Sequence, residues 1–329
     1  MDLTLPLGLV SDQMEADREK SFVREVCLPF LHNAQNADGG WGFHPQSESR
    51  VEPTCWAVQA LAASSIGEPP AGVRRGLQFL RAAQLSDGSW PSTQEQKSGC
   101  WLTSLGLWVL LTADRSTSQA ASAGLRWLCN DWPQDSTRWG RLLTRLASQK
   151  ELHPIKLSYR GWSWTPGTSS WVEPTSFALI ALEQGFHNVA PTIVNRRREL
   201  ATAMLYDRMC PGGGWNCGNP RVYGVPGEPL VIPTVWALIA LRRDATRGEN
   251  QESLDWLEQS VANIRSAASL ALAKICLETY GRTWPAAAST LVGLFEKNEF
   301  RENVPVVAWS CLAMSERSGW LDTRRPYAT

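Results

Sequence analysis

Two glutamates stand where a carboxyl group could donate a proton. Glu52 and Glu173 each precede a Pro-Thr pair, in the segments RVEPT and WVEPT, and each pair opens a strongly apolar stretch. Burial among apolar groups disfavours the charged carboxylate and raises the pKa, as a general acid requires. A structural explanation is equally open, because negative charge near a helix N-terminus is favourable by about 0.3–1 kcal/mol.

Aromatic side chains occur within the same apolar stretches. Their π faces could stabilise a cation in a pocket, or the rings could simply fill the core. The sequence leaves both roles open for each of the candidate lining residues, which are Trp56, Trp108, Trp171, Phe177, Trp236 and Trp309.

Three arginines, Arg50, Arg160 and Arg221, lie in the turns that precede apolar stretches. We expect the helices that follow these turns to begin at one end of the molecule, where converging helix N-termini favour an anion. Arginine adds charge-assisted hydrogen bonds to a phosphate or carboxylate. The turns therefore predict a binding site for an anionic group such as a diphosphate or carboxylate.

The elements that must position these residues recur as helix pairs. Residues 75–103 contain an amphipathic helix, a turn with Gly88 and Trp90, and an apolar helix that opens near Trp101. The same three-part unit recurs along the chain. Further apolar helices are predicted to open at Pro53, Pro174 and Pro233, and two weaker pairs cover 253–262 with 266–280 and 285–297 with 305–315.

The two helices of each pair differ in kind. One carries charges along a single face, as an outer helix should, and the other is apolar nearly all round and must be covered on both faces. Six such pairs predict an all-α fold, an (α/α)6 toroid with an inner and an outer ring. We expect one domain over residues 1–329 with flexible ends at 1–12 and 317–329, and an extra helix near 139–147.

The segment RGLQFLRAAQLSDGSW resembles the QW repeat of the superfamily that contains squalene cyclases, terpene cyclases and protein prenyltransferase β-subunits. Its pattern is filled by Arg75, Gly76, Phe79, Leu80, Gln84, Gly88 and Trp90, and the end of a second copy by Gln35, Gly39 and Trp41. Copies at Trp164 and Trp215 lack the glutamine. The resemblance implies the toroid fold and a structural role for these glutamines and tryptophans.

The resemblance also suggests what chemistry to test. Class II terpene cyclases protonate an alkene or epoxide with the middle aspartate of a DxDD motif at the start of an inner helix. No DxDD occurs in this chain, but alignment of the helix starts places WVEPT and RVEPT there, so Glu173 and Glu52 would act as the acids. Zinc prenyltransferases would need Asp and Cys where Leu230 and Ile232 stand, which argues against a zinc site.

Composition excludes other classes of function. The formal net charge is zero, so no electrostatic signature of nucleic-acid binding is present. The longest apolar run, residues 105–111, is far shorter than the roughly 20 residues of a membrane span. The 8 cysteines are scattered through apolar segments, which favours reduced thiols over a disulfide framework. With no secretory signal at the start, we expect a cytoplasmic protein, peripheral to the membrane at most.

These patterns predict an isoprenoid-handling protein of the terpene-cyclase type, with glutamate in place of aspartate. One alternative is a non-catalytic toroid that binds a lipid or a protein partner, and a weaker one is a toroid polysaccharide lyase or hydrolase. We expect no cofactor, with Mg²⁺ relevant only to a diphosphate substrate. The expected partners are an isoprenoid or other apolar small molecule, and a second subunit or a homodimer if the site needs two helical domains.

Overall fold

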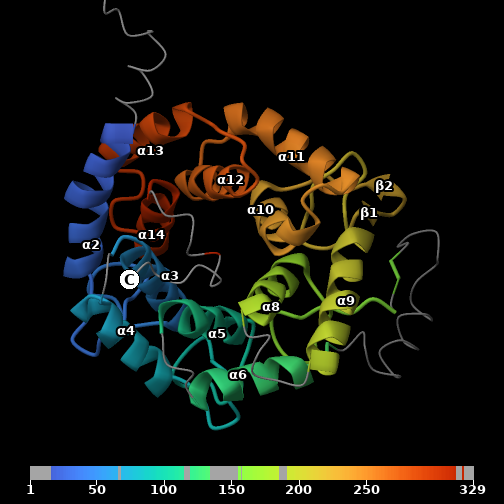
Figure 1. The fold of residues 1–329 in the computed structure, drawn as a ribbon, viewed down its shortest axis with the longest axis horizontal. Helices are drawn as coiled ribbons and strands as arrows, with labels where there is room; N and C mark the ends of the chain where they lie inside the picture. The colour runs from blue at the N-terminus through green and yellow to red at the C-terminus, as the bar shows by residue number, and fades with distance from the viewer. Residues whose placement is uncertain are drawn as a thin grey trace, which may run out of the picture.

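Helices arranged in two concentric rings make up the molecule (Figure 1). The computed structural model describes residues 16–65, 68–114, 119–133, 155–156, 158–184, 191–315 and 321. Within these residues the inner ring consists of α3 (Val51–Ala63), α5 (Leu102–Ala113), α8 (Val172–Gln184), α10 (Val231–Ala240), α12 (Ala267–Thr279) and α14 (Val304–Ala313). The outer ring consists of η1 (Val23–Cys27) with α2 (Leu28–Asn33), α4 (Ala71–Ala82), α6 (Gln119–Asn130), α9 (Pro191–Asp207), α11 (Gly248–Ser260) and α13 (Ala286–Glu296).

The inner ring is closed. Each inner helix contacts the next one along the chain, and α14 returns to contact α3 (Figure 1). The (α/α)6 toroid and its two weaker C-terminal pairs are therefore confirmed. A small hairpin, β1 (Arg221–Val222) and β2 (Val225–Pro226), and two short 3-10 turns, η4 (Arg242–Asp244) and η5 (Val261–Asn263), complete the described chain. The helix expected near 139–147 and the expected flexible ends, Leu321 apart, lie outside the described residues.

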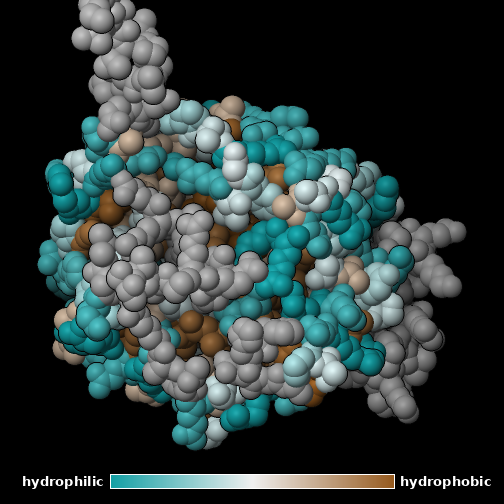
Figure 2. Space-filling view, viewed as in Figure 1, coloured by the Kyte–Doolittle hydropathy of each residue, from teal (hydrophilic) through white to brown (hydrophobic). Residues whose placement is uncertain are grey.

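The two rings bury their helices differently, as the sequence predicted. Nearly every residue of α3, α5 and α8 is buried. In the outer helix α4 the residues Val73, Leu77 and Leu80 are buried on one face, while Arg74, Arg75 and Arg81 face solvent. Figure 2 shows the result, a mainly hydrophilic rim with hydrophobic surface visible between the helices. Burial of the inner ring on both sides supplies the hydrophobic free energy that holds the toroid together.

The turn after each of the first two outer helices ties one helix pair to the next. The Gln84 side-chain amide donates hydrogen bonds to the carbonyl oxygens of Gly88, at 2.8 Å, and of Ala120 in α6, at 2.9 Å. The Trp90 indole N–H donates to the Leu80 carbonyl at 2.7 Å, and the Trp90 backbone N–H to the Thr103 hydroxyl at 3.0 Å. These bonds satisfy backbone groups at the helix ends, which would otherwise lack partners.

In the third unit the tryptophan that ties the turn together lies two residues earlier than the sequence assignment placed it. Trp162, not Trp164, takes the structural position, because its indole N–H donates to the Leu128 carbonyl at 3.0 Å and its backbone N–H to the Thr175 hydroxyl at 2.9 Å. Tryptophan and threonine are 13 residues apart here, as they are for Trp90 and Thr103. The WSW triplet offers two tryptophans, and only the distance to the threonine distinguishes them.

Candidate active site at the mouth of the toroid

The two predicted glutamates lie at the same end of the inner ring, which we call the mouth. Glu52 and Glu173 are the second residues of α3 and α8. Each stands two residues before the threonine that accepts a bond from a turn tryptophan, and Trp101 holds the same place at the start of α5. Because α5 contacts both α3 and α8, Trp101 stands between the two glutamates along the ring.

Burial controls the charge of both carboxyl groups. It raises the pKa of Glu52 to about 7 and also raises the pKa of Glu173, and no hydrogen bond or ion pair within the described residues opposes it. A carboxylate normally gains from nearby donors or cations, which lower its pKa. Without them, burial favours the protonated form of each carboxyl over the form that an exposed glutamate would take.

Each carboxyl lies one helical turn from an aromatic ring on the same helix face. Glu52 precedes Trp56 by four residues and Glu173 precedes Phe177 by four, a spacing that puts the members of each pair on one face. Helical side chains also tilt toward the N-terminus. The carboxyl groups are thus on the mouth side of the rings.

The rings form one connected layer across the interior. Phe177 and Trp236 have ring centroids 4.6 Å apart, and Trp56 lies 5.4 Å from both Trp236 and Trp309. Trp108 joins edge-on at 5.9 Å from Trp56. Apart from the half-buried Trp309, every ring is at most 4% exposed, so the rings pack against one another. An apolar ligand would therefore bind on the mouth side of this aromatic layer.

Trp171 lies apart from the aromatic layer. Its backbone N–H donates to the Trp162 carbonyl at 2.9 Å, and the half-buried ring belongs to none of the ring pairs of the layer. The sequence did not single out Trp101, although its ring lies 5.2 Å from both Trp164 and Phe177. Its alignment with the two glutamates was the signal that could have identified it.

The three arginines occupy separate surroundings. Arg50 precedes α3, pairs with Glu48 at 2.6 Å, and lines a cavity of about 690 Å³ between the first two turns. Its Nη1 is buried there without an acceptor among the described residues. Arg160 lies over the Trp132 ring, 5.4 Å from its centroid, and Arg221 is exposed on β1. Of the three, only Arg50 directly precedes an inner helix.

No protein site for a metal is evident in the described chain. Among its residues no group of three or more His, Cys, Asp or Glu side chains is placed to hold an ion. None of the described helices is both long enough and apolar enough to cross a membrane.

Comparison with known proteins places this geometry in context. The family model of the squalene-hopene cyclase C-terminal domain matches residues 8–100. Drimenyl diphosphate synthase from Streptantibioticus cattleyicolor is 40% identical over 79 residues, which are 24% of this chain and only 14% of that enzyme. The type II terpene cyclase MstE from Scytonema superposes with a TM-score of 0.59 at 12% identity, covering 94% of this chain and 99% of that one.

Over residues 8–100 the sequence resembles the squalene and terpene cyclase superfamily. Beyond that stretch the likeness is one of fold, which extends over nearly the whole toroid. Fold alone does not decide the reaction, because Rex8A from Paenibacillus barcinonensis, solved in complex with xylose, also superposes with a TM-score of 0.52 at 12% identity over 95% of each chain. Within the superfamily, the side chains at the mouth must therefore carry the functional argument.

Proposed function

We propose that this protein cyclises an isoprenoid by protonating a carbon–carbon double bond at the mouth of the toroid. The observation that carries the proposal is the pair of buried carboxyl groups, Glu52 and Glu173, each without a hydrogen-bond partner in the described chain and each one turn from the aromatic layer. A proton donor and a surface that stabilises cations are thereby adjacent.

The reaction would run as follows. The protonated Glu52 carboxyl gives its proton to the alkene, which leaves a carboxylate and a carbocation facing the rings. A second double bond of the substrate attacks this cation and closes a ring. A carboxylate then removes a proton from a carbon next to the new cation and restores a double bond, so that the product is an isomer of the substrate. Burial raises the pKa of both carboxyls, and the rise to about 7 for Glu52 makes it the first acid to test.

The choice of an isoprenoid rests on the superfamily and on the chemistry of the mouth. Of the proteins named above, MstE is a type II terpene cyclase and the Streptantibioticus relative is a drimenyl diphosphate synthase. Trp101 is half-buried, so it offers aromatic surface beside the carboxyls, and it packs on the buried Phe177 with ring centroids 5.2 Å apart. Because the toroid superposes on 99% of the MstE chain, we propose a site within one toroid rather than between two, which a mass measurement during turnover would test.

The test is product formation. We would incubate the protein with squalene, oxidosqualene and C15–C20 prenyl diphosphates and identify products by gas chromatography and mass spectrometry. Loss of a general acid typically costs about 10²–10⁴-fold in rate, so Glu52→Gln should abolish detectable turnover. Glu95→Gln is a matched control, because Glu95 is an exposed acid on the turn of the second unit. Unchanged turnover in Glu52→Gln and in Glu173→Gln would refute the acid role of these residues.

The buried aromatic layer favours one second candidate, binding of an apolar ligand without turnover. Four rings at most 4% exposed leave no room for a substrate below the carboxyls unless the rings move. If no substrate reacts but one of them quenches tryptophan fluorescence with saturable binding, the non-catalytic function is correct. Product formation by the unmodified protein would eliminate it.

A further inference from the structure

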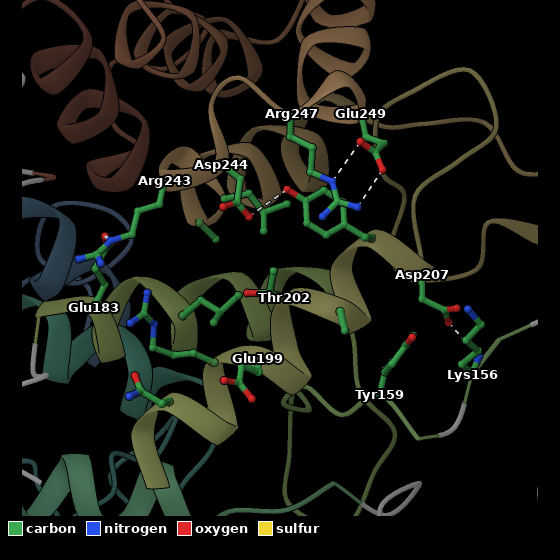
Figure 3. A pocket seen from close by; sticks show the side chains of 17 residues that line it. Lys156, Tyr159, Glu183, Glu199, Thr202, Asp207, Arg243, Asp244, Arg247 and Glu249 are labelled. Carbon is green, nitrogen blue, oxygen red and sulfur yellow. Dashed lines mark hydrogen bonds and ion pairs between the residues drawn. The ribbon is translucent and has the colours of Figure 1, made fainter. Parts of the chain in front are cut away.

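A second pocket lies at the opposite end of α8 from Glu173 (Figure 3). It encloses about 900 Å³ between α9, the end of α8, and the segment from η4 into α11. Glu183 in its wall follows Glu173 by ten residues, which is about 15 Å along a helix that rises 1.5 Å per residue. The Glu183 end of the pocket is therefore distant from the Glu173 carboxyl, and the pocket continues along α9 to Lys156, Tyr159 and Asp207 (Figure 3).

An arginine run in α9 leads to this pocket. Arg196, Arg197 and Arg198 read in the sequence as one solvated helix face, but successive residues of a helix point about 100° apart. Arg196 is exposed. Arg197 is 1% exposed and stacks between the rings of Trp132 and Trp162, at 3.9 Å from each centroid. Arg198 is half-buried and lines the pocket.

Arg198 faces the pocket without an acceptor. No hydrogen bond or ion pair joins it to another described side chain, whereas Arg242 and Arg243 both pair with the Glu183 carboxylate. Burial, followed by the positive charge of Arg243, lowers the pKa of Arg198, while Glu183 and Asp244 oppose that change. The Glu183 carboxylate is thus shared by two other guanidinium groups, and a partly buried cation that lacks an acceptor gains from a ligand that supplies one.

The other end of the pocket is mixed in charge. Arg247 stacks on the Tyr206 ring at 3.7 Å and pairs with Glu249 at 2.8 Å, and the Tyr206 hydroxyl donates to Asp244 at 3.3 Å (Figure 3). Glu199 also lines the wall. These carboxylates would repel a highly charged anion but would accept hydrogen bonds from hydroxyl groups. The lining fits a small ligand with one anionic group and a polar body, and it does not fit an isoprenoid chain.

We propose that this pocket binds a small polar metabolite through a phosphate or carboxylate group held by Arg198 and Arg243. Arg198 gains the acceptor it lacks, and Arg243 contributes a second guanidinium from η4 across the pocket. Bonds between charged partners are shorter and stronger than neutral ones. Hydroxyl groups of the ligand then face the carboxylates of the opposite wall.

The test is a binding measurement that needs no turnover, so its result is independent of the proposed reaction. Isothermal titration calorimetry would use inorganic phosphate and glucose 6-phosphate as probes. Removal of one charged hydrogen-bond partner weakens binding by about tenfold or more, so Arg198→Gln should show that loss for both probes. Arg196→Gln lies two residues away on the same helix with its side chain exposed, and it should bind as the unmodified protein does.

Two further measurements keep the proposal open to refutation. Arg243→Gln leaves Glu183 paired with Arg242, so it should fold and bind phosphate more weakly even if Arg198→Gln proves unstable. Equal affinity in both variants and in the unmodified protein would overturn the site, as would no binding of either probe at millimolar concentration. Binding to phosphatidic acid vesicles but not to the free anions would overturn the metabolite assignment and identify a lipid headgroup instead.

Discussion

Glu52 should make the stability of the protein depend on pH in a way that one substitution removes. Its pKa is raised from 4.5 to about 7 in the folded chain because burial disfavours the carboxylate. Between these two pH values the folded state holds a proton that the unfolded state has released. Stability must therefore fall as pH rises through this window, and the full penalty is present above pH 7.

The size of the penalty follows from the same values. A rise from 4.5 to about 7 corresponds to at most about 3 kcal/mol, at 1.36 kcal/mol per pH unit. Glutamine has nearly the shape of glutamate and no charge at any pH. Glu52→Gln should therefore be more stable than the unmodified protein by up to about 3 kcal/mol at pH 8, with the difference shrinking toward zero at pH 4.5.

Urea denaturation at pH 5, 6, 7 and 8 would measure this difference. The Glu95→Gln control should show no such dependence, because Glu95 is exposed and hydrogen bonds to its own backbone and to Thr93 lower its pKa, so it is ionised in the folded and the unfolded chain throughout this range. A stability difference between Glu52→Gln and the unmodified protein that stays constant across the four pH values would refute the reasoning. It would mean that the Glu52 carboxyl is solvated in the folded chain, and the proposed acid would lose its basis.

Three substitutions test the construction of the turns by their effect on the free energy of unfolding in urea. Trp162→Phe removes the donor to the Leu128 carbonyl and should cost about 1–3 kcal/mol, whereas Trp164→Phe should cost less than about 1 kcal/mol; the reverse order would restore the assignment made from sequence. Gly88→Ala should cost about 2 kcal/mol or more, because Gly88 has φ +93° and an added Cβ would lie 2.6 Å from the Ala123 backbone. If the Gly88→Ala variant and the unmodified protein had the same urea midpoint, the predicted clash with the Ala123 backbone would be wrong.

The fold was predictable from sequence because its signals are local and repeated. Gln84, Gly88 and Trp90 make their hydrogen bonds within one turn and to the adjacent helices. Their spacing is therefore fixed and can be recognised in the sequence. The inner helices are apolar all round wherever they sit in the ring. Such features need no knowledge of distant contacts.

The candidate site was predictable only in part, since it depends on distant contacts. Sequence placed Glu52 and Glu173 at helix starts, but their catalytic role remains a prediction. It could not show that Trp56 and Trp236, from helices far apart in the chain, lie 5.4 Å from each other. The sequence also could not show that Arg196 is exposed while Arg198 lines a pocket. The two residues are of one type and lie two positions apart, and only the direction in which each side chain leaves the helix axis distinguishes them.

Closure of the inner ring has a consequence for a shortened chain. α3 (Val51–Ala63) packs against α14 (Val304–Ala313), its partner from the last helix pair. α3 gains this partner only when α14 is present, so a chain cut before α14 would be an open ring rather than a smaller toroid. One apolar flank of α3 would then be uncovered. Because incomplete chains with exposed apolar surface aggregate, we expect such a truncated chain to aggregate instead of folding into five helix pairs.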